Sequence, residues 1–522
     1  MTTSGVPSPA STAAAQISTL VGSLAHFAAT QPERPAYIDA LSTLSYGALH
    51  EAARRGAAWL AQQGVGQGDT VALPLDGLPQ MARPALEMLY AIAYLGAVAL
   101  PLHPEVPLEM RIALLERHAA GWLIASGAPP QVAGARTLDP RGFDGGDPRY
   151  DSLPAPRGDR PDVPLFYFFT SGTTGEAKVL LPTHGQFHGS VCSSIRSLGM
   201  DNGDRVMAPL PWPASVSIRY LFHAHACGGA YVAAPIGETR MELGETLRRF
   251  GVTRMAASPW QIRRLLQSPA PLRPLPPLRS LRVTGAFISN EELGAARAAL
   301  TPHTNVGYGF NEIGAVSLLP PGEMGGPGYV GRLLPGVEAR VDRASGQALG
   351  PHHIGELGFR AAWMCTGYAG NPDATRERFR DGWFYPGDVG SIDPAGNVTL
   401  RGRTQEVVNY GGLKIWPEDV ESVLKQHPDV LDVALVGLPD PQAGEVPVAF
   451  LVPRVPLTGP LGDGLSDAAL RDFCRTRIDA WRVPPTFVAV AEIPRNQSGK
   501  IMREALVEAY LQARTALVGR QG

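Results

Sequence analysis

Residues 170–178 combine backbone and side-chain groups that can hold phosphate. The segment begins directly after the apolar run Leu165–Phe169 and reads Thr-Ser-Gly-Thr-Thr-Gly-Glu-Ala-Lys. Its glycines allow a tight turn whose N–H groups point inward, its hydroxyls add donors, and Lys178 adds a cation. It is not a Walker A loop, because alanine and not glycine precedes the lysine. Taken alone, the pattern fits a phosphate-binding loop or an ordinary polar hairpin turn.

Two carboxylates and a lysine further along the chain have chemistry that complements such a loop. Glu312 is a candidate ligand for Mg²⁺, which prefers hard oxygen donors and bridges to substrate phosphates, and Thr173 is a candidate second oxygen. Asp388, in a Tyr-Pro-Gly-Asp turn, can accept hydrogen bonds from two ribose hydroxyls. Lys500, in an Asn-Gln-Ser-Gly-Lys turn, can cancel charge that develops in a transition state. Taken singly, the aspartate can instead satisfy its own turn and the lysine can be a solvated charge.

Read in chain order, these segments resemble the motif series of the adenylate-forming superfamily, which groups acyl-CoA synthetases, stand-alone adenylation domains and insect luciferases. The matching segments are Thr170–Lys178, Tyr308–Glu312, Gly387–Asp388, Arg401–Arg403 and Asn496–Lys500. The resemblance extends from about Ile17 to Leu506 and is greatest to acyl-CoA ligases. The chain departs from the usual pattern at Ala177, Val179 and Asn311, where Pro, Gly and Thr are commoner.

The resemblance implies a role for each residue of these motifs. The loop at residues 170–178 holds the β- and γ-phosphates, and Tyr308 stacks on adenine, although a buried core tyrosine is the alternative. The implied catalytic residues are Lys500, Glu312 and Thr173, of which Glu312 and Thr173 bind Mg²⁺ and Lys500 bridges the substrate carboxylate and the α-phosphate. The implied ATP-binding residues are Thr170, Ser171, Gly172, Thr173, Thr174, Gly175, Lys178, Gly285, Ala286, Tyr308, Gly309, Asn311, Glu312, Asp388 and Arg403.

The same resemblance assigns a second half-reaction to the segment Val408–Ile415. Its Asn-x-Gly-Gly-x-Lys-Ile motif resembles that of acyl-CoA ligases more than that of amino-acid adenylation domains. Asn409, Gly411 and Gly412 are implied to line a tunnel in which a pantetheine thiol passes close to the backbone, and a plain β-hairpin turn is the alternative. Because adenylation and thiol transfer use different loops, the family rotates its small domain about a hinge, which maps onto Gln405.

Aromatic side chains mark a candidate pocket for the acid. They are Trp212, Trp260, Phe287 and Phe310, each in a segment that corresponds to a pocket wall of the family. If they line the pocket, they favour a short or compact acid over a long fatty acid, and core packing is the alternative for all of them. Arg219 is a candidate partner for a second carboxylate, and a solvated arginine is the alternative.

The elements that must position these residues follow an α/β pattern, in which helix-like segments alternate with short apolar strands. Ser45–Gln63 predicts an amphipathic helix. The apolar run Ala85–Leu102 predicts a buried helix leading into a strand, because a glutamate and a proline interrupt it. From Gly355 to Leu400, short strands and turns predict a β-rich subdomain.

We therefore expect a large N-terminal domain of layered α/β subdomains with a β-rich subdomain, followed by a small mobile α+β C-terminal domain. The predicted boundaries are a flexible tail at residues 1–16, an ATP- and acid-binding domain at residues 17–403, and a C-terminal domain with the catalytic lysine at residues 404–522. Helices of the small domain are predicted over Pro417–Gln426 and Ser466–Ile478.

Composition excludes several functional classes. The 46 Lys and Arg residues nearly balance the 48 Asp and Glu residues, so nucleic acid and anionic membrane are not expected as main partners. The four cysteines are scattered without a CxxC pair, which disfavours a disulfide framework or structural zinc and suits a reducing cytoplasm. The N-terminal residues lack the basic start of a signal peptide, and no apolar run is typical of a membrane span.

The sequence thus predicts an enzyme that uses ATP to convert a small carboxylic acid to an acyl-adenylate, releases pyrophosphate, and transfers the acyl group to the thiol of CoA. ATP, Mg²⁺ and CoA are the predicted cofactors. A stand-alone adenylation enzyme that loads the phosphopantetheine arm of an acyl carrier protein stays open, because only the acceptor differs. A non-catalytic nucleotide-binding protein is the alternative from another class, and the joint presence of Thr173, Glu312, Asp388 and Lys500 argues against it.

Overall fold

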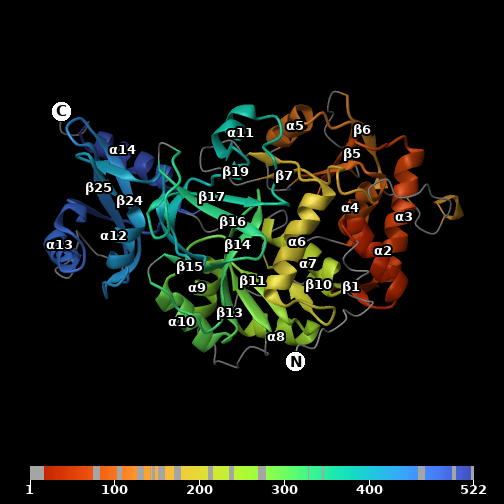
Figure 1. Ribbon diagram of the computed structural model, residues 1–522, viewed down its shortest axis with the longest axis horizontal. Coiled ribbons are helices and arrows are strands. Elements are labelled where there is room, and N and C mark those ends of the chain that lie inside the picture. The colour runs from red at the N-terminus through yellow and green to blue at the C-terminus, as the bar shows by residue number, and fades with distance from the viewer. Residues whose placement is uncertain are drawn as a thin grey trace.

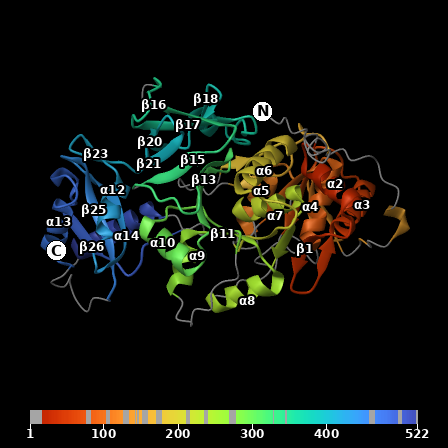
Figure 2. The ribbon, with the colours of Figure 1, turned by 60° about the horizontal axis from the view of Figure 1, so that its bottom comes forward.

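The computed structural model describes residues 17–74, 83–102, 108–125, 134–140, 143, 147–150, 159–169, 178–209, 215–233, 240–267, 278–326, 328–343, 346–455, 465–495 and 501–518. Side chains are described for these residues except 74, 240, 241 and 513–518. Within these ranges no helix combines the length and apolar character needed to cross a membrane. Helices α2 to α4 lie at one end of the molecule, a large sheet occupies the middle, and the C-terminal elements lie at the other end (Figures 1 and 2).

A small parallel sheet forms part of the N-terminal end. Its strand order is β4-β3-β5-β6, and every neighbouring pair is parallel. The strands are β3 (Thr70–Pro74), β4 (Val98–Leu102), β5 (Trp122–Ile124) and β6 (Arg136–Leu138). The helices of this part are α2 (Leu20–Thr30), α3 (Tyr46–Gln62), α4 (Arg83–Leu95) and α5 (Leu108–Arg117). The predicted amphipathic helix is therefore α3, which Ser45 caps, and the predicted buried helix and strand are α4 and β4.

The middle of the molecule is a 15-stranded sheet, in which the strands that come first in the chain are mainly parallel. Its order is β18-β19-β17-β20-β21-β15-β14-β13-β12-β11-β9-β10-β1-β2, and β16 also pairs with β17. The parallel strands are β1 (Pro35–Asp39), β9 (Arg205–Met207), β10 (Ala230–Ala233), β11 (Arg254–Ala257), β12 (Ser280–Val283) and β13 (Thr304–Phe310), and β2 (Thr43–Ser45) is antiparallel to β1. The helices between them are α6 (His184–Leu198), α7 (Ser215–Cys227), α8 (Arg240–Phe250), α9 (Pro259–Gln267) and α10 (Asn290–Ala299). Capping boxes begin α6 and α10, with Thr183 and Ser289 as the capping residues.

The second half of the same sheet is antiparallel. Its strands are β14 (Gly314–Leu319), β15 (Tyr329–Leu333), β16 (Val337–Asp342), β17 (Gly355–Ala361), β18 (Phe379–Arg380), β19 (Trp383–Phe384), β20 (Asp388–Ile392) and β21 (Asn397–Arg403), with α11 (Pro372–Arg378) between β17 and β18. A separate two-stranded hairpin pairs β7 (Phe168–Phe169) with β8 (Val179–Leu180). The predicted β-rich region is present, but it begins at β14 and not at Gly355, since β13 already turns back into β14.

The C-terminal elements form a separate five-stranded sheet with helices on both faces. The strands are β22 (Val408–Tyr410), β23 (Leu413–Ile415), β24 (Val430–Asp440), β25 (Gly444–Pro453) and β26 (Thr486–Ala489), and the helices are α12 (Pro417–Leu424), α13 (Asp467–Arg475) and α14 (Arg503–Val518). Alternate residues of β24 face the two sides of this sheet. Val433 and Leu435 belong to one core cluster with α12 and α13, whereas Ala434 and Val436 belong to another with α14. The mixed α/β class with a large and a small domain is confirmed.

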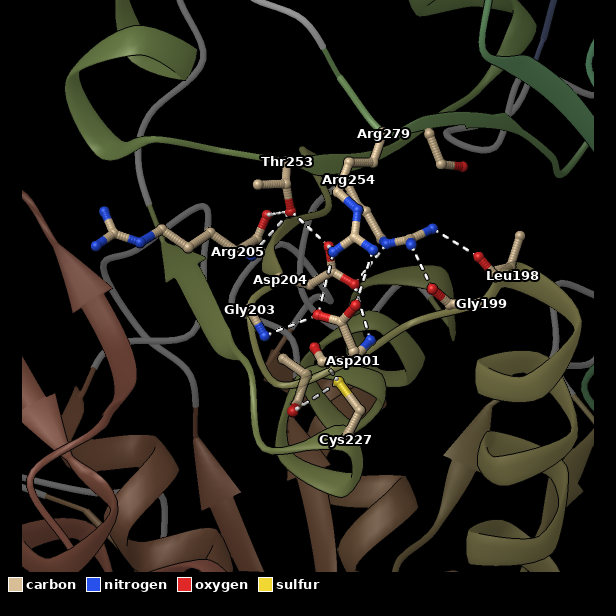
Figure 3. A network of polar contacts seen from close by, with 12 residues as sticks. Leu198, Gly199, Asp201, Gly203, Asp204, Arg205, Cys227, Thr253, Arg254 and Arg279 are labelled. Carbon is tan, nitrogen blue, oxygen red and sulfur yellow. Dashed lines mark hydrogen bonds and ion pairs between the residues drawn. The ribbon is translucent and has the colours of Figure 1, made fainter. Parts of the chain in front are cut away.

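A buried ionic network ties together the amino ends of the parallel strands (Figure 3). Asp204, just before β9, pairs with Arg254 at the start of β11 at 2.7 Å and with Arg279, just before β12, at 2.9 Å. Arg254 also donates hydrogen bonds to the carbonyl groups of Leu198 and Gly199 at the end of α6, at 2.8 and 2.6 Å. Since these contacts lie at the amino ends, the opposite carboxyl ends of the strands remain for a ligand site.

Candidate active site

Several candidate residues of the large domain follow β11, β12 and β13, which are neighbouring parallel strands. After these strands come Trp260 in α9, then Gly285, Ala286 and Phe287, and then Asn311 and Glu312. In open α/β sheets, ligands bind outside this carboxyl edge. Gly285 has φ of +95°, a conformation that residues with a Cβ rarely adopt. The shared edge therefore places three sequence motifs around one site.

The turn that contains Glu312 is held at three successive carbonyl groups. It joins β13 to β14, in which Phe310 pairs with Gly314. The guanidinium Nη2 of Arg219 donates to the Asn311 carbonyl at 2.9 Å, and the backbone N–H of Cys365 donates to the Glu312 carbonyl at 2.8 Å. The indole N–H of Trp363 donates to the Ile313 carbonyl at 2.9 Å. Because the donors come from α7 and from the segment 363–365, the backbone of this turn has little freedom.

The carboxylate of Glu312 is buried and accepts a hydrogen bond from Tyr368, whose hydroxyl lies 2.6 Å from Oε1. Burial and the nearby Glu312 carboxylate both raise the pKa of the Tyr368 hydroxyl, so that this group remains a donor. The ammonium group of Lys178 lies 5.3 Å from the centroid of the same tyrosine ring. Partial burial, together with Arg378, lowers the pKa of Lys178, whereas Glu312 opposes that shift.

Glu312 suits a magnesium ion that is bound mainly through substrate. Among the residues that the structure describes, no cluster of three or more His, Cys, Asp or Glu side chains can enclose a metal. Mg²⁺ bound with nucleotides usually takes one or two carboxylates and completes its shell with phosphate oxygens and water. One buried carboxylate whose second oxygen accepts no hydrogen bond from the described residues is compatible with that pattern. The other predicted ligand, Thr173, lies outside the described residues.

Arg219 is not the solvated arginine that its residue type suggests. Besides the Asn311 carbonyl it donates to Ser190 Oγ at 2.7 Å, and its guanidinium lies 5.6 and 5.2 Å from the ring centroids of Phe168 and Phe187. Burial lowers the pKa of Arg219 to about 10, and the Glu312 carboxylate is among the groups that oppose the shift. Arg219 and Glu312 line the same narrow cavity. Arg219 therefore contributes positive charge to the site as well as holding its backbone.

Tyr308, Asp388 and Arg403 form one hydrogen-bonded group. The Tyr308 hydroxyl donates to Asp388 Oδ2 at 2.6 Å, and Arg403 Nε lies 3.1 Å from Asp388 Oδ1. The register of β20 and β21 places Asp388 opposite Arg403, which explains the ion pair. The preceding Gly387 has φ of +83°, and a Cβ there would lie 2.4 Å from a nitrogen of Arg378. Three residues from separate motifs are thus brought together.

The candidate pocket aromatics do not form one group. Trp260 and Phe287 are half exposed, at 48% and 49%, after neighbouring strands. The guanidinium of Arg264 lies 5.4 Å from the Trp260 ring. Phe310 instead packs edge-on against Phe384, with centroids 5.5 Å apart, in the core of the antiparallel half. This position matches the core-packing alternative for Phe310.

The glycine pair of the small domain is the tip of a hairpin. Gly411 and Gly412 connect β22 to β23 with φ of +59° and +83°, which is typical of a type I′ turn. A Cβ added to either glycine would meet no atom within 4 Å. Asn409 lies in β22 opposite Lys414, and its backbone N–H donates to Glu445 at 2.6 Å. The segment is therefore a hairpin with open space around its tip, and the thiol tunnel stays a prediction.

Gln405 lies between two anchored neighbours. On one side, both the N–H and the hydroxyl of Thr404 donate to the Gly387 carbonyl, at 2.8 and 2.6 Å. On the other side, Glu406 pairs with Arg503 of α14 at 2.9 Å. Gln405 itself is exposed. The residue before Gln405 is therefore bound to the large sheet, and the residue after it is bound to the C-terminal elements.

Several predicted site residues lie outside the described part of the chain, so the structure does not place them. They are Thr170, Ser171, Gly172, Thr173, Thr174, Gly175, Trp212 and Lys500. Conversely, sequence reasoning gave no role to Tyr368, Trp363 and Cys365, and it gave Arg219 a different one. The Thr-Gly-Tyr sequence ending at Tyr368 carries no recognisable chemical pattern, because its partner Glu312 is distant in the chain.

Comparison with known proteins covers nearly the whole chain. The family described as AMP-binding enzyme matches residues 24–369, and the family described as AMP-binding enzyme C-terminal domain matches residues 419–500. A long-chain-fatty-acid–CoA ligase of Mycobacterium tuberculosis is 27% identical, over 92% of this chain and 97% of that protein. A fatty acid–[acyl-carrier-protein] ligase of Streptomyces coeruleorubidus is 28% identical, over 95% of this chain and 97% of that protein.

A solved structure has the same arrangement of elements. The O-succinylbenzoate coenzyme A synthetase of Bacillus subtilis, in complex with ATP and a magnesium ion, is 26% identical to this chain. The alignment covers 92% of this chain and 98% of that one, with a TM-score of 0.77. The similarity therefore includes both the large and the small domain.

Proposed function

Because the chain belongs to the AMP-binding enzyme family, we propose that it is an AMP-forming acid–thiol ligase that activates a carboxylic acid with ATP and transfers the acyl group to CoA. The observation that carries this proposal is the joint placement of Glu312 and the Tyr308–Asp388–Arg403 group within a fold whose two family matches span both domains. A non-catalytic binding protein would not require a buried carboxylate held ready for a metal.

In the first half-reaction, a carboxylate oxygen of the acid attacks the α-phosphorus of ATP, and pyrophosphate leaves. Asp388 orients the nucleotide. Each of its carboxylate oxygens contacts one described residue and can still accept a hydrogen bond from a ribose hydroxyl. Glu312 would hold Mg²⁺, which neutralises phosphate charge when bound. Lys178 adds positive charge from the end of the predicted phosphate loop, and Lys500 is assigned to the α-phosphate.

In the second half-reaction, the thiol attacks the acyl carbonyl carbon and AMP leaves. We assign the thiol path to Asn409, Gly411 and Gly412, where the open space around the hairpin tip leaves room for an extended chain. Residues 17–403 then form the ATP- and acid-binding domain, and residues 404–522 form the small domain. Gln405 is the proposed hinge, since its neighbours are anchored to different domains.

The proposed substrate is a compact carboxylic acid. Trp260 and Phe287 are exposed at the carboxyl edge of the sheet, where they offer apolar surface, and Trp212 is assigned to the same pocket from the sequence. An acyl carrier protein is the alternative acceptor. The similarity to the fatty acid–[acyl-carrier-protein] ligase of Streptomyces coeruleorubidus supports this alternative.

Acid-dependent exchange of labelled pyrophosphate into ATP, measured across a panel of short, aromatic and long-chain acids, tests the first half-reaction. CoA and a phosphopantetheinylated carrier protein are then offered as acceptors, and the thioester is identified by mass. Exchange with at least one acid and a CoA thioester would support the proposal. A thioester on the carrier alone would select the alternative acceptor, and exchange with none of the acids would contradict the enzyme assignment.

A further inference from the structure

Tyr368 joins the two charged groups that the proposed reaction places around the triphosphate. Its hydroxyl donates to Glu312 Oε1 at 2.6 Å, while its ring lies 5.3 Å from the Lys178 ammonium group. The next residue, Ala369, donates its N–H to the Val179 carbonyl at 2.7 Å. A single short segment therefore links the end of the predicted phosphate loop to the candidate metal ligand.

The position of Tyr368 is itself strongly determined. Its backbone N–H donates to Thr375 Oγ1 of α11 at 2.9 Å, and its ring packs edge-on against Phe379 with centroids 5.5 Å apart. The side chain is 7% exposed. A tyrosine fixed at both its backbone and its ring can hold a partner carboxylate in one rotamer. Residues that hydrogen-bond to metal ligands commonly orient those ligands in this way.

The hydroxyl contact leaves one oxygen of Glu312 available. Oε1 accepts from Tyr368, and among the described residues no hydrogen bond is made to Oε2. The backbone of the same turn is already fixed by Arg219, Cys365 and Trp363. These contacts fix the backbone but not the orientation of the Glu312 carboxylate, which is set by its hydrogen bond from the Tyr368 hydroxyl.

We propose that Tyr368 is a positioning residue for magnesium-dependent ATP binding, which aims Oε2 of Glu312 at the metal and keeps Lys178 on the same triphosphate. This inference rests on the proposed function and adds to it a residue that acts through Glu312 and not on substrate. Loss of a hydrogen bond behind a metal ligand typically weakens metal affinity about 10- to 100-fold.

Tyr368→Phe is the decisive variant, because it keeps the ring against Lys178 and Phe379 and removes only the hydroxyl. The first measurement is the thermal stabilisation by ATP at graded Mg²⁺ concentrations, which needs no knowledge of the acid. We expect the half-saturating Mg²⁺ concentration to rise about 10-fold or more. Tyr385→Phe is the matched control, since its hydroxyl also donates to a carboxylate at 2.6 Å, that of Asp342, to which no metal-binding role is assigned.

A second measurement separates positioning from general stability. Tyr368→Phe is combined with Glu312→Gln, and the Mg²⁺ dependence of all four proteins is compared. If Tyr368 acts through Glu312, the tyrosine change has little further effect once the carboxylate is gone. A shift of equal size in both backgrounds, or an unchanged half-saturation in Tyr368→Phe, would overturn the inference.

The outcome also distinguishes the inference from the proposed function. If the unsubstituted protein shows no Mg²⁺-dependent stabilisation by ATP, the proposed function fails and the inference fails with it. If the unsubstituted protein responds normally and Tyr368→Phe matches it, only the inference is overturned. A rise in Mg²⁺ half-saturation in Tyr368→Phe and none in Tyr385→Phe supports both.

Discussion

A lysine ammonium group has a full positive charge and three N–H donors, which suit it to the charge that develops at the α-phosphorus of ATP. We assign this task to Lys500 and predict that Lys500→Ala slows adenylate formation about 10²- to 10³-fold, the usual cost of losing one such group. Thioester formation from a supplied acyl-adenylate and the affinity for ATP are expected to change little. Rapid-quench assays of each half-reaction, with ATP affinity from calorimetry, measure these effects.

The control for this prediction is Lys425→Ala, which removes another lysine of the same domain. Its ammonium group lies 3.6 Å from Asp432 within the small domain, and no role in the reaction is assigned to it. Adenylate formation that is unchanged in Lys500→Ala would refute the role assigned to Lys500.

At this scale, sequence reasoning identifies residues whose chemistry is contained in a short motif. Asp388 and Arg403 were selected separately, and the structure places them 3.1 Å apart because they face each other across β20 and β21. Tyr368 and the backbone contact of Arg219 could not be predicted in the same way. Each depends on a partner far along the chain, and neither residue type indicates that partner.

At the scale of elements, the connection between β21 and β22 decides whether the two domains can rotate. A proline at position 405 fixes its own φ and restricts Thr404, which is already bound to the Gly387 carbonyl. We predict that Gln405→Pro leaves adenylate formation within about 3-fold and slows thioester formation about 10-fold or more, because only the second step requires the rotation. Gln405→Ala, which leaves φ free, is the control. Equal loss of both half-reactions in separate assays would refute the hinge.

A second element-scale prediction concerns the contact between α12 and β21. Glu418, the second residue of α12, is packed so closely against β21 that a Cβ on Gly402 would lie 2.5 Å from its Oε2. The pKa of Glu418 is raised from an ordinary value of 4.5 to about 8, mainly by burial and also by Glu421 and Glu406, while Arg503 opposes the shift. The fourth charged neighbour is Arg403. The folded state therefore keeps this carboxyl group protonated at neutral pH.

The sign of the pH effect follows from the raised pKa. Its contribution favours folding fully below about pH 4.5 and is lost as the pH rises through about 8, where the buried group must ionise. We predict that the unfolding temperature of the protein falls between about pH 4.5 and 8, and that Glu418→Gln reduces this fall. Differential scanning calorimetry across that range measures it. Glu504→Gln, an exposed carboxylate of α14, should leave the pH dependence as it is, and the same flattening there would contradict the assignment.

Helices are predictable where periodicity agrees with a helix-start signal, which is a capping serine for α3 and a proline with an acidic first turn for α12. The interval Ser45–Gln63 becomes α3, with Ser45 as its cap, and Pro417–Gln426 becomes α12, which ends at Leu424. The environment of Phe310 was less accessible from sequence. Tyr308 and Phe310 are two residues apart on β13 and so share one face, where Phe359 packs against both rings. The elements packed against a strand decide which of its faces lines a pocket, so the local sequence of the strand does not predict that face.

At the scale of the whole molecule, structural and chemical tasks are divided between the two ends of the parallel strands. The ionic network of Asp204, Arg254 and Arg279 occupies the amino ends (Figure 3), whereas Trp260, Phe287 and Glu312 follow the carboxyl ends of β11, β12 and β13. Changes in the network should therefore alter stability without changing the balance between the half-reactions. Family resemblance predicts the site but not this network, because its charges have no recognisable motif.

Asp204→Ala tests this division. Asp204 is fully buried and Arg254 is 6% exposed, so removal of the carboxylate leaves a buried guanidinium without its partner. Such a loss typically costs about 3–5 kcal/mol, which we expect as a lower midpoint of the main unfolding transition in urea. The control is Asp201→Ala, which removes the exposed partner of Arg279 and should cost about 0–1 kcal/mol. At a temperature where both variants are folded, the ratio of adenylation to thioester formation should equal that of the unsubstituted protein. Equal destabilisation by the two changes, or a selective loss of one half-reaction in Asp204→Ala, would show that the amino ends are not purely structural.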